Sequence, residues 1–379
     1  MTGVLATISA GFLNGGPLFL ADEVPNDRTF WFPPQYSNHA PTVDWPFYFI
    51  TWVCIFFLVL ITVLMLIFMW RYSRHRGVVA DHDAATHNTP LEITWSFIPL
   101  VLVIIMFYIG FAGYMDMEVA PKESYQIDVE AKQWSWAFKY PNGWIDPNLH
   151  VWADQPFTMV MSSADVLHAM FIPDFRVKKD IVPGKFSSLW FVPQNRTGEI
   201  EVHHLFCAEY CGTDHSNMYA QVFVHPTKES YEEWLAKESD PYGRGLAPEV
   251  IGDMFYRNRG CAGCHLINGV RFTGPPLNLT WGEVTVGERD FAKGPPLDTS
   301  DPLFAENYVL ESLYEPNQRV VEGFSVPTQM STQKSQLNQR DVDSIIAFLK
   351  WMHDNPDFDP ERTPYKLWQE EQAAAEDAE

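Results

Sequence analysis

Residues Pro46 to Trp70 read PFYFITWVCIFFLVLITVLMLIFMW, a run of 25 positions without a single charged side chain. A second uncharged run, of 23 positions, extends from Ile93 to Met115. Either run could cross a hydrocarbon layer of about 30 Å as a helix. Tryptophans near the ends of both runs are typical of the membrane–water interface. The pattern therefore predicts a transmembrane helical hairpin over residues 45–117, and a pair of helices buried in a soluble core is the alternative.

Charges around the two runs predict the orientation of this hairpin. The connection between the runs contains three arginines, whereas the 45 residues before the first run contain one. Arginine and lysine are enriched in cytoplasmic connections, so we expect this connection in the cytoplasm and both termini outside. Residues 1–44 then form an extracytoplasmic tail. Its apolar stretch, Val4 to Phe12, lacks the basic residues that begin a signal peptide, so a cleaved signal peptide is not predicted.

Composition excludes several classes of protein. The 379 residues are 46% hydrophobic, which excludes a disordered polymer and allows two or three domains. Acidic residues outnumber basic ones by 48 to 26, and the formal net charge is -22. Such a surface repels phosphate backbones, so nucleic acid is not an expected partner. Four of the five cysteines form two close pairs, a spacing that indicates ligands rather than disulfide bonds.

Short segments of alternating polar and apolar residues follow Met117. Tyr125 to Glu130 and Phe157 to Met161 alternate in this way, and Pro, Gly and Asn residues separate such segments. This pattern is typical of strands, and it predicts an all-β sandwich over residues 118–226. Residues 227–248 are expected to form a short amphipathic helix and a linker that contains Pro and Gly.

Helical periodicity returns after the linker. Apolar residues from Glu249 onward recur at helical spacing, which predicts an all-α domain over residues 249–355. Residues 356–379 are predicted to be an acidic C-terminal tail. Its end, Gln369 to Glu379, is rich in alanine and acidic residues, so we expect it to be mobile.

A loop rich in soft ligands lies near the end of the predicted sandwich. Residues 207–218 read CAEYCGTDHSNM, so two thiols, an imidazole and a thioether fall within twelve positions, with His168 further upstream. Thiolate, imidazole and thioether together favour copper. Two cysteines on one loop can bridge two metal ions, with His168 and His215 each completing one ion and Met218 and the Glu209 carbonyl as weak outer ligands. We therefore expect a binuclear copper centre.

A structural zinc site with two thiolate and two imidazole ligands is the alternative that spacing alone permits. The methionine argues against zinc, because structural zinc sites rarely use a thioether. His203 and His204 directly precede the loop. Neighbouring strand residues point to opposite faces, so we do not expect these two histidines to be ligands.

Cys261, Cys264 and His265 form the pattern C-x-x-C-H, the covalent attachment signature of a c-type haem. The two thiols add to the haem vinyl groups, and the adjacent imidazole becomes the proximal iron ligand. A chance occurrence in another redox or zinc protein is the alternative. A helical segment before the motif, the stretch GPPL at 274–277 after it and a closing helix favour the haem. Met330 is the only methionine between the motif and the last helix, and is the expected sixth ligand.

Several motifs together resemble subunit II of the haem-copper cytochrome c oxidases. They are the copper loop, DVLHAMFIP at 165–173, QWSW at 133–136, and NTPLEITW at 88–95 leading to Pro99. The motifs occur in the family's order, and the match covers roughly residues 40–240. The following all-α domain resembles a class I cytochrome c domain fused to this subunit. The implied fold is a two-helix transmembrane hairpin, a cupredoxin-like all-β sandwich and an all-α class I cytochrome c domain.

The resemblance assigns roles to single residues. It implies that the centre is the one called CuA, with the ligands His168, Cys207, Glu209, Cys211, His215 and Met218. It implies that the side chain of Glu209 reaches a magnesium ion at the interface with subunit I. Trp134 matches the aromatic residue through which electrons enter from cytochrome c, although a tryptophan of the sandwich core is the alternative.

The resemblance also bears on Glu92 and on Met330. Glu92 matches a glutamate at the mouth of a proton pathway into subunit I, and an ordinary interfacial charge is the alternative. The haem ligand Met330 departs from the family pattern. The family usually has proline after the methionine, whereas here Ser331 follows it and Pro327 lies three residues earlier.

The resemblance implies the electron-transfer subunit of an oxygen-reducing, proton-translocating terminal oxidase. The donor would be a cytochrome c or a quinol-oxidising complex, and electrons would pass through haem c and CuA to subunit I. The expected location is the bacterial cytoplasmic membrane, with subunit I, other oxidase subunits and lipid as partners. Electron delivery to a nitric oxide reductase and a copper-assembly protein are the alternatives. The methionine, the second histidine and the haem motif argue against an assembly protein.

Overall fold

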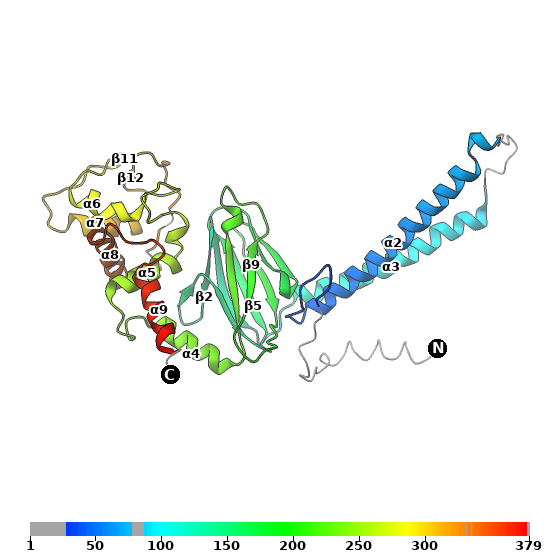
Figure 1. Cartoon of the computed structure of the whole chain (residues 1–379), viewed down its shortest axis with the longest axis horizontal. Helices are drawn as coiled ribbons and strands as arrows, with labels where there is room; N and C mark the ends of the chain where they lie inside the picture. Colours follow the sequence, from blue (N-terminus) through cyan, green and yellow to red (C-terminus); the bar gives the residue numbers. More distant parts are fainter. Residues whose placement is uncertain (1–27, 78–86, 331, 335, 377–379) are drawn as a thin grey trace.

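The computed structural model describes residues 28–77, 87–330, 332–334 and 336–376. Figure 1 shows three parts in a row along the longest axis, namely a helical hairpin, a β-sandwich and a group of helices. The sandwich lies between the other two parts. The sequence predicted no cleaved signal peptide at the stretch from Val4 to Phe12. These residues lie outside the described part of the chain.

The hairpin consists of helices α2 (Ala40–Arg71) and α3 (Thr89–Glu118). Both are long and apolar enough to cross a membrane, and the most apolar stretch of each is unburied within the chain. A soluble protein rarely exposes so large an apolar surface, which favours lipid as its surroundings. Both helices start before the uncharged runs. Asn88 caps α3 by accepting a hydrogen bond from the backbone of Leu91 at 3.2 Å.

The β-sandwich consists of two five-stranded sheets with the orders β3-β2-β1-β5-β8 and β4-β10-β9-β6-β7. Side chains alternate between core and solvent along the strands, as in β9, where Leu205 is buried between exposed His204 and Phe206. This alternation is the reason that the sequence predicted a sandwich, and the prediction is confirmed. The strands are β1 (Tyr125–Lys132), β2 (Ser135–Lys139), β3 (Ile145–Asp146), β4 (Leu149–Trp152), β5 (Phe157–Ser163), β6 (His168–Ile172), β7 (Val177–Ile181), β8 (Ser187–Phe191), β9 (Glu201–Cys207) and β10 (Tyr219–His225).

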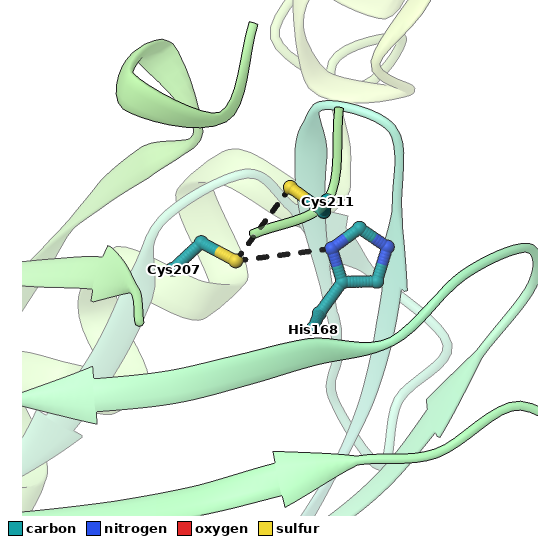
Figure 2. Close-up of side chains that lie close together, drawn as sticks. All are labelled: His168, Cys207 and Cys211. Atoms are coloured by element: carbon teal, nitrogen blue, oxygen red, sulfur yellow. Dashed lines mark hydrogen bonds between the residues drawn. The ribbon is translucent and has the colours of Figure 1, made fainter. Parts of the chain in front are cut away.

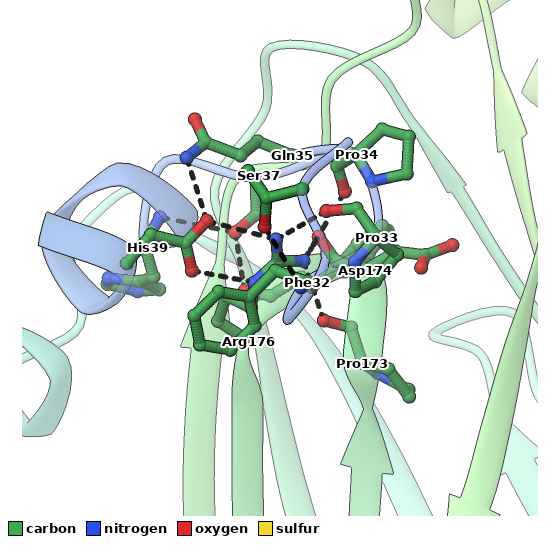
Figure 3. Close-up of polar contacts among 12 residues, drawn as sticks. Phe32, Pro33, Pro34, Gln35, Ser37, His39, Pro173, Asp174 and Arg176 are labelled. Atoms are coloured by element: carbon green, nitrogen blue, oxygen red, sulfur yellow. Dashed lines mark hydrogen bonds and ion pairs between the residues drawn. The ribbon is translucent and has the colours of Figure 1, made fainter. Parts of the chain in front are cut away.

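A buried ion pair joins the sandwich to the start of the hairpin (Figure 3). Arg176 donates hydrogen bonds to both carboxylate oxygens of Asp44, from Nε at 2.9 Å and from Nη2 at 3.0 Å. The same guanidinium donates to the carbonyls of Pro33 at 2.6 Å and Pro173 at 2.9 Å. Asp44 belongs to α2, whereas Arg176 lies directly before β7. This two-point pairing fixes the orientation of the sandwich relative to α2.

Helix α4 (Lys228–Ser239) follows the sandwich and lies against β4 and β10. Trp234 of this helix stacks on His150 of β4, with ring centroids 3.6 Å apart. His150 Nδ1 lies 3.1 Å from His225 Nε2 at the end of β10, and both imidazoles are buried. The amphipathic pattern of residues 227–237 predicted this helix, but not the pair of histidines beneath it.

The C-terminal part contains helices α5 (Pro248–Asn258), α6 (Leu277–Thr285), α7 (Phe304–Tyr314), α8 (Gln339–Asp354) and α9 (Pro364–Glu376), with a small sheet of β11 (Phe291–Lys293) and β12 (Val320–Val321). Helices α5 and α8 approach closely at Gly252. A Cβ there would lie 2.0 Å from the carbonyl oxygen of Ser344, so only glycine fits. The domain is thus mainly helical. The small sheet departs from the all-α expectation, because strands this short leave no period in the sequence.

The predicted acidic tail requires a correction. Within residues 356–379, Pro364–Glu376 form helix α9, which packs against α5. The backbone N–H of Tyr365 donates to Asp253 at 2.9 Å, and the Tyr365 side chain is buried. Trp368 lies beneath the guanidinium of Arg244, 4.5 Å from the ring centroid. Two aromatic residues at the start of the helix thus bind residues 364–368 to the domain. The stretch that is expected to be mobile, Gln369 to Glu379, begins after them.

Candidate metal centre and the adjoining cavity

Three chain segments bring the predicted copper ligands together. His168 is the first residue of β6, and Cys207 is the last residue of β9. These strands are antiparallel neighbours with Met170 paired to Cys207, so both ligands lie at one end of the sheet. The other four ligands lie on the loop between β9 and β10. A short 3-10 helix, His215–Asn217, turns this loop back toward the cysteines.

The donor atoms on these segments form one cluster, and Figure 2 shows three of its buried members, His168, Cys207 and Cys211. Cys207 Sγ lies 3.8 Å from Cys211 Sγ and 3.9 Å from His168 Nδ1. Cys211 Sγ lies 3.4 Å from His215 Nδ1. Each thiol thus has the other thiol and one imidazole as neighbours. This donor set fits two metal ions bridged by two thiolates, with one histidine on either side.

Two weaker donors complete the cluster. Met218 Sδ lies 3.8 Å from Cys211 Sγ, and the carbonyl oxygen of Glu209 lies 3.2 Å from Cys207 Sγ. Met218 is only 1% exposed. A zinc site of two thiolates and two imidazoles would leave this buried thioether without a role, whereas copper accepts thioether ligands. His203, in contrast, is bonded to Asp174 at 2.7 Å, in agreement with its exclusion as a ligand.

Asp165 is a candidate functional residue that the sequence did not reveal. Its carboxylate lies 2.8 Å from His168 Nε2 and accepts a hydrogen bond from the backbone of Gln133 at 2.7 Å. A carboxylate bonded to the far nitrogen of a ligand histidine fixes the ring orientation and raises its basicity. Its position three residues before His168 was the available signal, but aspartates in turns are too common for spacing alone to identify one.

The surroundings of the cluster favour the thiolate of Cys207 but keep protons on Cys211 and His168. Burial opposes ionisation of Cys207, but its hydrogen bond with His168 lowers the pKa of this thiol. Burial and the nearby Cys207 raise the pKa of Cys211. Burial also opposes a charge on His168, but the bond to Asp165 raises the pKa of this imidazole to about 9. Metal binding would displace the protons that these groups carry.

The C-x-x-C-H motif lies at the edge of a cavity in the C-terminal domain. Cys261, Cys264, His265 and Met330 all line this cavity. His265 Nδ1 lies 2.9 Å from the carbonyl oxygen of Pro275, which leaves Nε2 as the free nitrogen of the ring. Gly274 lies so close that a Cβ there would be 2.5 Å from His265 Cε1. Apolar residues of α6, α7 and α8 supply much of the remaining wall, namely Leu277, Val309, Leu313, Ile345, Phe348 and Leu349.

The loop that carries Met330 is attached to α7. Asn317, just after this helix, accepts a hydrogen bond from the backbone of Thr328 at 3.0 Å. The Thr328 hydroxyl accepts one from the backbone of Met330 at 3.2 Å. These bonds hold the loop without a proline after the methionine. Met330 is half-buried and lines the same cavity as His265.

Trp134 lies where the sandwich meets the C-terminal domain. Its ring centroid is 6.0 Å from that of Phe272, and a Cβ on Gly212 of the copper loop would lie 3.0 Å from its ring. Trp134 is half-buried, whereas Trp136 is fully in the sandwich core. The loop that holds Trp134 thus separates the metal cluster from the C-x-x-C-H cavity.

Glu92 lies far from both centres, in the first turn of α3. Its Oε1 accepts a hydrogen bond from the backbone of Asn88 at 3.0 Å and lies 3.9 Å from His87 Nδ1. These contacts stabilise the helix start. The side chain is also partly exposed, so it remains available to a neighbouring subunit.

The hairpin, the sandwich and the soft-ligand cluster define a membrane-anchored protein with an extracytoplasmic cupredoxin-like domain. Residues 25–112 match the family described as cytochrome c oxidase subunit II, transmembrane domain, and residues 144–224 match its periplasmic domain. These two parts of the chain are therefore similar to the two domains of cytochrome c oxidase subunit II.

Several curated proteins are similar to this chain. Cytochrome c oxidase subunit 2 of Synechocystis is 27% identical over 54% of this chain and 74% of its own length. Cytochrome c oxidase subunit 2 of Alkalihalophilus pseudofirmus is 26% identical over 77% of this chain and 82% of its own length. Among solved structures, the periplasmic domain of subunit II of cytochrome oxidase from Bradyrhizobium japonicum is 28% identical, with a TM-score of 0.28, over 31% of this chain and 96% of that one.

Proposed function

We propose that this chain accepts electrons for a terminal respiratory oxidase through two centres of its own, a fused haem c and a binuclear CuA centre. The similarity of residues 25–112 and 144–224 to the two domains of cytochrome c oxidase subunit II supports the oxidase role. The observation that carries the proposal is the cluster around Cys207 and Cys211, whose two sulfur atoms lie 3.8 Å apart with an imidazole beside each.

The copper ligands of this proposal are His168, Cys207, Glu209, Cys211, His215 and Met218. A pair of copper ions held by these residues would accept one electron with a small change of charge at each ion. The protein holds the ligands in place before an electron arrives, since strands carry His168 and Cys207 and Asp165 fixes the imidazole. The carboxylate of Glu209 remains the proposed magnesium ligand at the interface with subunit I.

The proposed haem is attached through Cys261 and Cys264, with His265 and Met330 as its iron ligands. The cavity that these residues line suits this group, because its walls are largely apolar and His265 presents its free Nε2. The match to the Alkalihalophilus pseudofirmus relative covers 77% of this chain, so it must include residues beyond the linker at 240–247. This coverage supports a C-terminal domain shared with some relatives.

The proposed partners are subunit I, other oxidase subunits, membrane lipid and an extracytoplasmic electron donor. The proposed location is the bacterial cytoplasmic membrane, with both termini outside. Glu92 is the proposed start of a proton pathway into subunit I. The complex purified through this chain tests these proposals. We expect two coppers and one covalent haem per chain and a copurifying haem-copper subunit that reduces oxygen. One zinc in place of copper, or a nitric oxide reductase as the copurifying subunit, would contradict the proposed function.

The sixth haem ligand is tested by Met330→Ala. A thioether ligand stabilises ferrous haem, so the variant should have a lower reduction potential than the parent. It should also lose the near-infrared absorption that arises from charge transfer between a thioether and ferric iron. If that band survives in the variant, the ligand is another residue.

A further inference from the structure

We infer that Gln133 couples the two proposed redox centres, because it connects a cysteine of the haem motif to a cysteine of the copper cluster. This inference rests on the proposed function, since it assigns a path between the centres which that function requires. The sequence reasoning considered the neighbouring Trp134 for electron arrival and gave Gln133 no role.

Two contacts of one residue carry the inference. Cys264 Sγ lies 3.8 Å from the backbone carbonyl oxygen of Gln133. The side-chain amide of Gln133 donates a hydrogen bond from Nε2 to the carbonyl oxygen of Cys211 at 2.7 Å. Between these two contacts the path consists only of the covalent bonds of Gln133. Cys264 and Cys211 are therefore linked by one van der Waals contact, one residue and one hydrogen bond.

Close packing on both sides holds Gln133 in this position. A Cβ on Gly212 of the copper loop would lie 2.9 Å from Gln133 Nε2. On the side of the haem motif, a Cβ on Gly260 would lie 2.7 Å from Ser135 Oγ, and Lys132 Nζ donates to the Arg259 carbonyl at 3.2 Å. The backbone of Gln133 is itself fixed by its bond to Asp165. Gly212 and Gly260 thus allow the two segments to approach Gln133 and its neighbours closely. A larger residue at either position would push the segments apart.

The step that this path serves transfers one electron and no proton. The haem attached through Cys264 is oxidised by one electron, the copper pair bound by Cys211 is reduced by one electron, and no bond forms or breaks. Electron tunnelling decays less steeply through covalent and hydrogen bonds than through empty space. A path over Trp134 is less direct, since its ring meets the C-terminal domain at Phe272, with the ring centroids 6.0 Å apart. Gln133 is accordingly a positioning residue that acts through its two contacts.

The test compares Gln133→Leu with the parent in the intact oxidase complex. Leucine keeps most of the volume but cannot donate to Cys211. The matched control is Gln155→Leu. The side-chain amide of Gln155 also donates a hydrogen bond to a backbone carbonyl, that of Glu123 at 3.1 Å, which belongs to neither proposed centre. The rate of electron transfer from haem to copper is measured after photoreduction of the haem. The reduction potentials and the copper electron paramagnetic resonance spectrum are recorded for each protein.

Limited digestion with trypsin reports whether the domains stay docked. Trypsin cleavage after Arg244 requires opening of the segment between α4 and α5, because Arg244 is bonded to Glu238 at 3.1 Å and covers Trp368. We expect a several-fold lower transfer rate in Gln133→Leu, with unchanged potentials and cleavage, and the parental rate in Gln155→Leu.

The outcomes separate this inference from the proposed function. An unchanged rate in Gln133→Leu overturns the inference alone, as does a loss of rate in Trp134→Leu but not in Gln133→Leu. A lower rate that is accompanied by faster cleavage also overturns it, because Gln133 then acts only in docking. If the parent binds no copper or no haem, the proposed function itself fails.

Discussion

At the scale of single residues, the metal cluster depends on two thiols that the protein treats differently. Cys207 is at the end of a strand and has His168 and the Glu209 carbonyl as close neighbours. Cys211 is on the loop and has His215 and Met218. Each thiol therefore lies beside two further donor atoms of its own. Substitution of either cysteine would remove one of the two proposed bridging thiolates rather than an outer ligand.

Cys207→Ser tests this arrangement. A serine hydroxyl is a hard, weakly acidic donor, so the variant should lose the spectrum of one electron shared between two coppers. Haem should remain attached and reducible, since its ligands lie in another domain. Copper content, the paramagnetic resonance spectrum and haem absorbance measure these effects. Cys54→Ser, which changes an exposed cysteine of α2, is the control and should behave like the parent. A parental copper spectrum in Cys207→Ser would refute the bridging role.

The residues that the sequence predicted and those that it missed differ in one respect. Five of the six proposed copper ligands are Cys, His or Met, which are types that bind metals, and five of the six lie within twelve consecutive positions. Asp165 and Gln133 are ordinary polar residues whose roles come from contacts with other segments. Gln133 is 78 residues from Cys211 and 131 from Cys264 in sequence. Only the tertiary structure brings such residues together.

At the scale of secondary-structure elements, the ion pair between Arg176 and Asp44 connects the sandwich to the hairpin. Arg176→Met should destabilise the anchored sandwich by about 3–5 kcal/mol, because it leaves the buried Asp44 carboxylate without its partner. The expected result is a lower unfolding temperature of the sandwich in detergent. The double variant Arg176→Met/Asp44→Leu should recover much of the loss, since no buried charge remains. Equal unfolding temperatures for the single variant and the parent would show that the pair adds no stability.

The two buried histidines beneath α4, His150 and His225, predict that the stability of the protein depends on pH. Burial lowers the pKa of His225 to about 4, and it also lowers the pKa of His150, with the charge of His225 as a lesser cause. Unfolded histidine has a pKa of about 6.5, so the unfolded chain binds protons first as the pH falls. Stability should therefore be full above about pH 6.5 and decline toward pH 4.

The measurement is the unfolding temperature of the parent and of His225→Asn between pH 7 and pH 4. Asparagine does not titrate in this range, so the decline should be shallower in the variant. The variant also removes the effect of His225 on the pKa of His150, so the difference in slope reports the pair of histidines. Groups away from this pair contribute equally to both proteins. Parallel curves would mean that His225 does not contribute. The amphipathic pattern indicated helix α4, but it could not reveal what lies beneath the helix.

At the scale of the whole molecule, the parts lie in a row with the C-terminal domain farthest from the hairpin (Figure 1). The hydrophobic runs and the strand alternation predicted the membrane and sandwich parts, because each leaves a regular period in the sequence. How the C-terminal domain docks on the sandwich was not predictable. The contacts with that domain come from Lys132 at the end of β1 and from Gln133 and Trp134 in the turn after it, which has no periodic pattern.

Glu92 belongs to this scale, because its proposed role requires another subunit. Glu92→Gln keeps an oxygen that can accept from the Asn88 backbone, but it removes the titratable group. We expect several-fold slower turnover, while reduction of haem and copper is unchanged. Oxygen consumption and stopped-flow absorbance measure the two quantities, and Glu123→Gln, at an exposed position, is the control. Turnover at the parental rate would leave Glu92 as a helix-start charge only.

Burial of the ligand cluster also constrains how the protein is made. His168 has no exposed surface, and Cys207 and Cys211 are 8% and 3% exposed. A metal ion cannot reach these atoms from solvent while the loop between β9 and β10 is closed and Gln133 holds Cys211 from the other side. Metallation therefore has to precede closure of this loop or wait for it to open. Delivery of a metal ion to this site is thus coupled to movement of the loop between β9 and β10.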